Sequence, residues 1–266
     1  MPETSQMPSV VLEHIGQDIA LLSINRPKKL NTLDSRTIDL LLEAFTKIAA
    51  DNSLRVVILS GTGTAFSVGG DLQEVMEISA DPLWESRMQK MMASAAALIL
   101  QMRCLPQPII AAINGPAVGG GMALAVAADM RLCSTSAYFS TAYIAIGLVG
   151  FEMGLSVLLP SIIGASAAFD LAVSGRRLSA QQAERLSLVR EVVQSEELIA
   201  RATELAQEIA SRSARAVRST KEMMNNHFSL MHLQQALEAE VAAQMQCIFS
   251  KENRAAIAQV ANKNPR

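Results

Sequence analysis

The sequence predicts an α/β fold in which strands and helices alternate and a run of helices closes the chain. Three observations lead to this prediction. Short apolar runs typical of buried strands are each followed by a turn and then by a segment with helical spacing. Two of these turns are rich in glycine and stand between a strand and a helix. From residue 196 onward the pattern is almost entirely helical.

The elements follow from the same patterns, taken in chain order. A hairpin turns at Gly16, and Asp34 or Ser35 is the expected cap of the first long helix. The expected strands are residues 10–15, 19–24, 56–60, 108–113, 130–134 and 192–193. The expected helices are residues 35–50, 71–78, a long segment ending near 103, 122–128, 155–163, 164–174 and a short helix from 179. We expect a core of residues 1–195 and a helical region of residues 196–266.

The composition excludes several classes of function. A net charge of −2 gives no signature of nucleic-acid binding. The three cysteines are isolated and indicate reduced thiols in a cytoplasmic protein, and the three histidines lack metal-ligand spacing. Residues 104–128 carry no charge, but prolines and glycines divide them into strand, turn and helix. We therefore expect buried core there and no membrane span.

The two glycine-rich turns are the candidate functional feature. Gly119, Gly120 and Gly121 follow one strand, and Gly69 and Gly70 follow another. The first N–H groups of a helix have no internal acceptor, so such turns favour negative charge. Two of them can aim two N–H groups at one oxygen. The alternative is that these glycines only relieve crowding.

Four segments resemble the crotonase (enoyl-CoA hydratase/isomerase) superfamily. Residues 65–72, AFSVGGDL, are similar to its A-F-x-x-G-x-D-[LI] element, and residues 114–121, NGPAVGGG, to its N-G-x-x-x-G-G-G element. Residues 25–33, NRPKKLNTL, resemble its N-R-P-x-x-x-N-A-L loop, and residues 174–189 its T-G-x…A-x-x-A…G-L-V signature. The likeness runs in order from about residue 10 to the C-terminus.

The resemblance implies a spiral of repeated ββα units with a C-terminal helical trimerisation region. It also implies acyl-CoA thioester substrates and a homotrimer or dimer of trimers, with no metal and no cofactor beyond the coenzyme A of the substrate. In the family, the positions of Gly70 and Gly120 donate the two N–H groups that hold an enolate oxygen. The further expected substrate contacts are Arg26, Lys28, Lys29, Leu30, Val68, Gly69, Asp71, Leu72, Gly119 and Tyr143.

The chain departs from the family at both glutamates that hydratases use. Ala123 and Tyr143 occupy those positions, and neither can replace a carboxylate as base. One acid remains nearby, Glu152, in a loop where some family members also carry an acid. Its apolar neighbours Phe151 and Met153 predict a raised pKa, suited to moving a proton near neutral pH. The alternative role for Glu152 is a first-turn acid of the next helix.

These residues favour double-bond isomerisation over hydration, since one base can take a proton from one carbon and return it to another. An atypical hydratase that positions water through Glu152 and Tyr143 is the alternative within enzymes. A non-catalytic acyl-CoA-binding protein is the alternative from another class. Three methionines, at positions 88, 91 and 92, are candidates for lining an acyl pocket or for simple core packing.

Overall fold

The computed structural model describes residues 8–227 and 230–263. A six-stranded sheet forms the centre of the molecule, with strand order β1-β2-β3-β4-β6-β9. Strand β1 pairs antiparallel with β2, and the remaining neighbours pair in parallel, so helices must connect them. The strands are β1 (Val10–Ile15), β2 (Ile19–Ile24), β3 (Val56–Gly61), β4 (Ile109–Ile113), β6 (Met130–Ser134) and β9 (Glu191–Val193).

Both faces of this sheet are buried, because alternate side chains of each strand point to opposite faces. Val57 and Leu59 of β3 belong to the larger apolar cluster, which also contains residues of several helices. Val56 and Ile58 belong to a second cluster, whose buried helical residues all come from one helix. Helices of the first cluster include α1 (Ser35–Ala50), α3 (Trp84–Cys104) and α4 (Gly120–Ala127), and the helix of the second is α8 (Leu198–Ala210).

A second, three-stranded sheet lies beside the first and was not predicted from the sequence. Its order is β5-β7-β8, with β5 and β7 parallel. Each strand has only two or three residues, which is too short for a periodic pattern to show. The strands are β5 (Ala117–Val118), β7 (Tyr138–Ser140) and β8 (Leu178–Ser179). The sheet places the second glycine turn next to the segment that carries Tyr143.

Shorter helices surround the edge of the molecule where the turns lie. Asp34 caps α1 by accepting the N–H of Thr37 at 2.8 Å, as the sequence predicts. Ser179 and Gln182 form a capping box at the start of α7. These elements are η1 (Pro27–Lys29), α2 (Leu72–Ser79), η2 (Tyr143–Ile146), α5 (Leu155–Ile163), α6 (Ala165–Ser174) and α7 (Ala180–Arg185).

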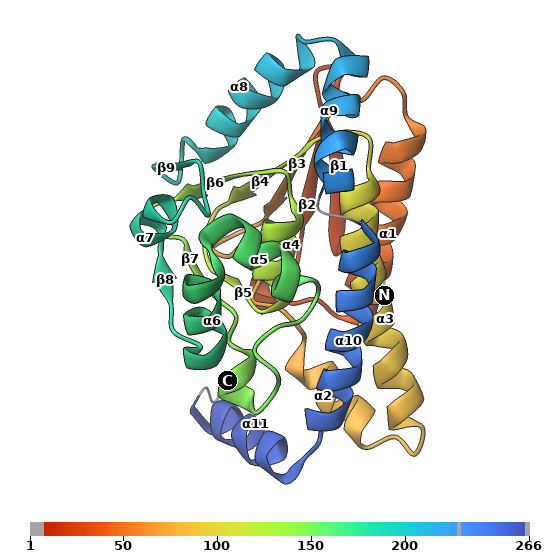
Figure 1. Ribbon diagram of the computed structural model, residues 1–266, viewed down its shortest axis with the longest axis vertical. Helices are drawn as coiled ribbons and strands as arrows, with labels where there is room; N and C mark the ends of the chain where they lie inside the picture. The colour runs from red at the N-terminus through yellow and green to blue at the C-terminus, as the bar shows by residue number, and fades with distance from the viewer. Residues whose placement is uncertain (1–7, 228–229, 264–266) are drawn as a thin grey trace, which may run out of the picture.

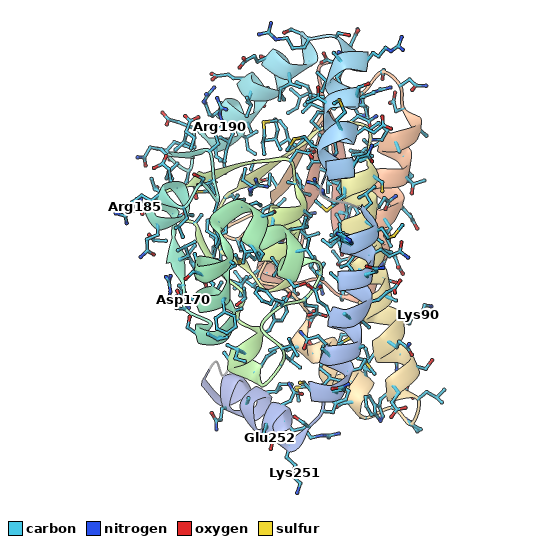
Figure 2. The ribbon with its side chains drawn as sticks, viewed as in Figure 1. Lys90, Asp170, Arg185, Arg190, Lys251 and Glu252 are labelled. Atoms are coloured by element: carbon cyan, nitrogen blue, oxygen red, sulfur yellow. The ribbon has the colours of Figure 1, made fainter. Side chains whose placement is uncertain are left out.

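The C-terminal helices pack on the body of the same chain. In Figure 1, α10 runs alongside α3, and the two helices contact each other closely. Leu233, Leu237 and Ile248 are buried in the main apolar cluster, so this face of α10 is covered within the chain. Figure 2 shows the charged side chains of Lys90, Arg185 and Lys251 projecting outward from helices. The elements are α9 (Ala214–His227), α10 (Leu230–Cys247) and α11 (Lys251–Lys263).

Buried charges anchor α9 to the end of α3. Lys221 binds Asp129 at 2.7 Å and also donates to the carbonyls of Met102 and Gln107. Arg103 pairs with Asp129 at 3.5 Å and with the side chain of Asn225. Burial lowers the pKa of Lys221, and its contact with Asp129 offsets part of that effect. The cluster therefore ties the C-terminal region to the core.

The uncharged stretch at residues 104–128 contains the predicted strand and helix, β4 and α4, and the segment predicted as a turn between them also holds the short strand β5. Helix α4 begins at Gly120, two residues before the predicted start at Met122, so that the glycine triplet enters the helix. Among the described residues, no helix has the length and apolar character needed to cross a bilayer. The predicted strands and helices are otherwise present, with small shifts at their ends.

Candidate active site

The first glycine turn pairs with the loop that precedes α1. Leu33 donates its N–H to the carbonyl of Gly69 at 2.8 Å and accepts the N–H of Asp71 at 3.2 Å. In such a parallel bridge, Leu33 uses both of its backbone groups, and the intervening residue Gly70 faces the other side. A methyl group on Gly70 would meet no atom within 4 Å. The N–H of Gly70 therefore lies beside open space.

The second glycine turn brings another N–H to the same place. Gly119 donates to the carbonyl of Ser140 at 2.9 Å, so the N–H of Gly120 points away from that strand. As the first residue of α4, Gly120 has no acceptor for this N–H within its own helix. A methyl group on Gly69 would lie 3.0 Å from the nitrogen of Gly120. The residue before Gly70 and the nitrogen of Gly120 are therefore close neighbours.

Gly69 and Gly119 are glycines for a backbone reason as well. Their φ angles are +84° and +54°, in the left-handed region that L side chains rarely adopt. Each comes directly before one of the two candidate donors. The reversal at each glycine turns the following N–H out of the strand pairing, which is what both donors require.

Asp71 holds the predicted basic loop against the first turn. One carboxylate oxygen caps α2 through the N–H of Gln73 at 3.1 Å. The other accepts Arg26 at 3.0 Å and Lys29 at 3.1 Å. Burial opposes ionisation of Asp71, but the bonds from Lys29 and Arg26 outweigh it and hold the pKa of Asp71 below its ordinary value. The ionised Asp71 carboxylate therefore holds the basic loop in place beside the first glycine turn.

This network changes the view of the basic residues expected at coenzyme A. The side chain of Arg26 is only 12% exposed and binds Asp34 at 2.8 Å as well as Asp71. Its charge is committed to the protein interior. Lys28 and Lys29 are exposed, and Lys29 borders a cavity of about 200 Å³ that Asp71 also lines. These two lysines are the better placed of the three to meet an anion from solvent.

The remaining expected contacts lie along the same seam. Val68 donates its N–H to the carbonyl of Leu30 at 3.2 Å, which joins the basic loop to the first turn. Leu30 is 45% exposed. Its φ of 50° lies in the left-handed region, which is uncommon for leucine. Leu72 is the first residue of α2. The structure thus brings these residues together with Gly69, Gly70 and Asp71.

Glu152 reaches the site through the loop before α5. Its neighbour Met153 is buried, and the sulfur of Met153 would lie 3.1 Å from a methyl group on Gly120. No described residue donates a hydrogen bond to the Glu152 carboxylate, which is only partly exposed. Burial, followed by the negative charge of Glu240, raises the pKa of Glu152 from 4.5 to about 7. This carboxylate is suited to exchange a proton at neutral pH.

Tyr143 packs against the second glycine turn at Gly119. Atoms of its ring would be 3.6 Å from a methyl group on Gly119. Its hydroxyl is buried and has no hydrogen-bond partner among the described residues. Burial raises the pKa of Tyr143 well above its ordinary value, and Glu152 and Glu240 add to the effect. The hydroxyl is therefore a neutral group that lacks a partner beside the candidate site.

Sequence reasoning missed two residues that hold the Glu152 loop, Glu240 and Gln244 of α10. A signal for them was present, because both fall on the same helical face as Leu233 and Leu237. Polar residues within an apolar stripe indicate buried partners. Nothing in the sequence identifies those partners as the backbone of residues 149–156.

Other features of the molecule lie away from these turns. A cavity of about 540 Å³ is lined by residues of α8, α9 and the end of α3, and neither glycine turn nor Glu152 borders it. Met88 and Met92 are buried in the main apolar cluster. Within residues 8–227 and 230–263, no group of three or more His, Cys, Asp or Glu side chains can hold a metal ion.

Comparison with known proteins identifies the family. A model described as enoyl-CoA hydratase/isomerase matches residues 14–265. The chain belongs to this family, the crotonase superfamily. A probable enoyl-CoA hydratase EchA12 from Mycobacterium tuberculosis is 38% identical over 91% of this chain and 85% of its own length. The resemblance stated from the four motifs is therefore confirmed.

Solved structures of this family share the fold. An enoyl-CoA hydratase/isomerase from Mycobacterium paratuberculosis has a TM-score of 0.85 and 28% identity, covering 96% of this chain and 99% of that one. A monofunctional enoyl CoA isomerase from M. smegmatis has a TM-score of 0.71 and 35% identity, covering 86% and 99%. The predicted crotonase-like α/β fold is confirmed.

The family's two hydratase glutamate positions can now be placed. Ala123 is fully buried in the first turn of α4, where its N–H donates to the carbonyl of Gly119 at 3.0 Å. Tyr143 is the buried phenol already described. Met153, the neighbour of Glu152, packs on the Gly120 turn, and the charge of Glu152 contributes to the raised pKa of Tyr143.

Proposed function

We propose that this family member is an enoyl-CoA isomerase that shifts a carbon–carbon double bond with Glu152 as the base. The observation that carries the proposal is the Glu152 carboxylate, which accepts no hydrogen bond from the described residues and has a pKa of about 7, in a loop packed on the Gly120 turn. Ala123 offers no second acid or base, and Tyr143 stays protonated near neutral pH. One proton-shuttling group is sufficient for isomerisation.

The reaction follows from these positions. The thioester oxygen would accept the N–H groups of Gly70 and Gly120, which favour negative charge on that oxygen. Glu152 takes a proton from C2 of a 3-enoyl thioester, and the C–H electron pair forms a dienolate. The protonated Glu152 returns the proton to C4, the double bond settles between C2 and C3, and the carbonyl re-forms. Electrons and protons balance without a redox partner.

The same proposal covers the ligand groups. Coenzyme A enters as part of the substrate, and the step above uses no metal and no further cofactor. We propose that Lys28 and Lys29 meet its phosphates, because both are exposed at the loop that Asp71 holds beside Gly70. Arg26 then acts indirectly, by fixing that loop through Asp71 and Asp34.

An atypical hydratase is the second candidate, and the Tyr143 hydroxyl favours it. A buried hydroxyl without a partner beside Glu152 is a site where a water molecule would be held. Glu152 would remove a proton from that water as the oxygen attacks C3, and would then deliver this proton to C2 of the resulting enolate. This route needs a water ordered between Glu152 and the substrate, whereas isomerisation needs only the substrate.

The experiment is a substrate panel on purified protein. 2-Enoyl-, 3-enoyl- and dienoyl-CoA are each incubated with the protein, and chromatography with mass detection separates hydrated from isomerised products. Conversion of 3-enoyl- or dienoyl-CoA to an isomer of unchanged mass, with no water added across the double bond, supports the proposal. Hydration of 2-enoyl-CoA as the dominant reaction would establish the hydratase instead. Binding of all three thioesters with no turnover would identify a non-catalytic acyl-CoA-binding protein.

A further inference from the structure

The loop that carries Glu152 has a conformation that its own residues do not favour. Met153 has a φ of 55°, a left-handed value that costs a non-glycine residue on the order of 1 kcal/mol or more. The next helix, α5, has no side-chain cap from Gly154. Such a loop keeps its shape only where neighbouring elements fix it. Those neighbours lie on α10, far along the chain.

Glu240 of α10 holds the C-terminal side of the loop. Its two carboxylate oxygens accept the N–H of Gly154 at 2.7 Å and the N–H of Ser156 at 2.9 Å. The side chain is 6% exposed. A carboxylate at a helix N-terminus satisfies donors that have no intrahelical acceptor and matches the helix dipole. Glu240 thus caps α5 from another helix.

Gln244, one turn further along α10, holds the N-terminal side. Its amide oxygen accepts the N–H of Val149 at 3.0 Å, and its amide nitrogen donates to the carbonyl of Val149 at 3.1 Å. The same nitrogen lies 3.5 Å from the carbonyl of Phe151. Gln244 is fully buried. Glu240 and Gln244 therefore bind the backbone on both sides of Glu152 through hydrogen bonds.

We propose that Glu240 and Gln244 form a clamp that positions Glu152 at the glycine turns, and that the charge of Glu240 keeps Glu152 ready to exchange a proton near neutral pH. Both are positioning residues, since neither touches the N–H groups of Gly70 or Gly120. The inference rests on the proposed function, because it assigns Glu152 its working pH.

The electrostatic surroundings of Glu152 support the second half of the proposal. Glu240 from α10 is the charged group that acts on it, and Tyr143 from η2 is the neutral titratable group nearby. Helices α4 and α5, which carry the Gly120 turn and follow the loop, contain no ionisable side chain. A negative charge beside a second buried carboxyl favours its protonated form. Removing the charge of Glu240 should therefore make Glu152 a stronger acid.

Two variants separate the effect of the Glu240 charge from the effect of the hydrogen bonds that hold the Glu152 loop. E240Q removes the charge and keeps an amide oxygen that can accept one of the two N–H groups. Q244L removes the three contacts at Val149 and Phe151 and leaves every charge in place. E238Q is the matched control, because Glu238 is an exposed carboxylate on the same helix. All three are made in the full chain and compared by circular dichroism before any titration.

The readout is kcat/KM against pH on the substrate that the panel identifies. The wild-type profile should rise through a midpoint near pH 7, as Glu152 loses its proton. E240Q should move the midpoint down by roughly one pH unit. Q244L should lower kcat roughly 10-fold to 100-fold, because Glu152 is then held less firmly in position. The midpoint should stay unchanged, because no charge near Glu152 is altered. E238Q should match the wild type.

A second measurement does not depend on turnover. With ¹³C-labelled glutamate, NMR follows the side-chain carboxyl carbons, and the Glu152 signal is the one that disappears in E152Q. Its midpoint should fall in E240Q. E240N removes the same charge and replaces E240Q if the latter does not fold.

The outcomes distinguish the clamp from the function. A Glu152 midpoint that is the same in the wild type and in a folded variant without the Glu240 charge would overturn the role of that charge. A Q244L variant with wild-type kcat would overturn the positioning role. If the panel finds no turnover, the proposed function fails, and the NMR titrations still decide whether Glu240 sets the protonation of Glu152.

Discussion

A methyl group on Gly121 would lie 2.0 Å from the carbonyl oxygen of Ser67, so the two glycine turns touch backbone to backbone. The same oxygen accepts the N–H of Val118 at 2.9 Å. This contact sets the distance between the segment leading to Gly70 and the first turn of α4. It explains why only glycine fits at position 121, independently of any bound substrate.

Replacing Gly121 with alanine should therefore reduce stability and activity together. The added methyl must push the turns apart, at a cost of roughly 1–3 kcal/mol for an overpacked site. The separation would also misplace the two N–H groups. Urea unfolding and turnover are measured on G121A, with G70A as the control because its methyl has open space. G121A with wild-type stability would mean that the contact is looser than the structure has it.

Gly70 allows a direct test of the N–H donor. G70P removes the N–H, and G70A keeps it at a position where a side chain meets nothing within 4 Å. Turnover should fall by about 100-fold or more in G70P, the usual effect of losing one oxyanion donor. G70A should stay within a few-fold of the wild type. Equal activity in the two folded variants would show that the Gly70 N–H does not bind the reacting oxygen.

The sequence predicted the main sheet and the two glycine turns because these are local patterns. The apolar run of β4 and the helix after it are visible without any partner. The meeting of the turns is not local, since it depends on the bridges of Leu33 with Gly70 and of Ser67 with Ala117. The glycine pattern suggested that the turns could serve one oxygen, and the family motifs identified Gly70 and Gly120 as the two donors.

The candidate base illustrates the same limit. Its apolar sequence neighbours predicted a raised pKa for Glu152, and burial is indeed the larger cause. The second cause, Glu240, lies on a helix that reaches the loop only in the folded chain. Arg26 shows the converse: a basic residue in an exposed-looking loop turns inward, because Asp34 and Asp71 converge on it.

Assembly remains a prediction from the family resemblance: a homotrimer or a dimer of trimers. The apolar residues Leu233 and Leu237 of α10 are buried within their own chain. A contact between copies must therefore use other surfaces. Light scattering at micromolar concentration should give three or six times the chain mass. A monomeric mass would show that this chain does not assemble as the resemblance implies.

The raised pKa of Glu152 should make the free energy of unfolding depend on pH. The folded protein binds this proton up to about pH 7, and the unfolded chain releases it near the ordinary value of 4.5. Stability from this group is therefore lost as pH rises through that window. E152Q should gain stability relative to the wild type between pH 4.5 and 8, on the order of 1–3 kcal/mol. A stability difference that does not change with pH, in urea unfolding, would contradict the shift.

The deciding prediction concerns the chemistry of Glu152 itself. E152Q keeps the size and polarity of the side chain and removes its ability to accept a proton. Turnover of the true substrate should fall roughly 100-fold to 10,000-fold, the usual contribution of a positioned acid–base group. Acyl-CoA affinity should change little, because Gly70, Gly120 and the exposed lysines keep their places. Turnover is measured at saturating thioester, and affinity by calorimetry with an unreactive acyl-CoA.

Y143F is the matched variant for this test, because it removes the partnerless hydroxyl and leaves Glu152 intact. In an isomerase, Y143F should keep most of its turnover, since the proton moves between two substrate carbons through Glu152 alone. In a hydratase that holds water on this hydroxyl, the turnover of Y143F should fall nearly as far as that of E152Q. Full activity in E152Q together with a large loss in Y143F would remove Glu152 as the base and assign the chemistry to the Tyr143 side of the Gly119 turn.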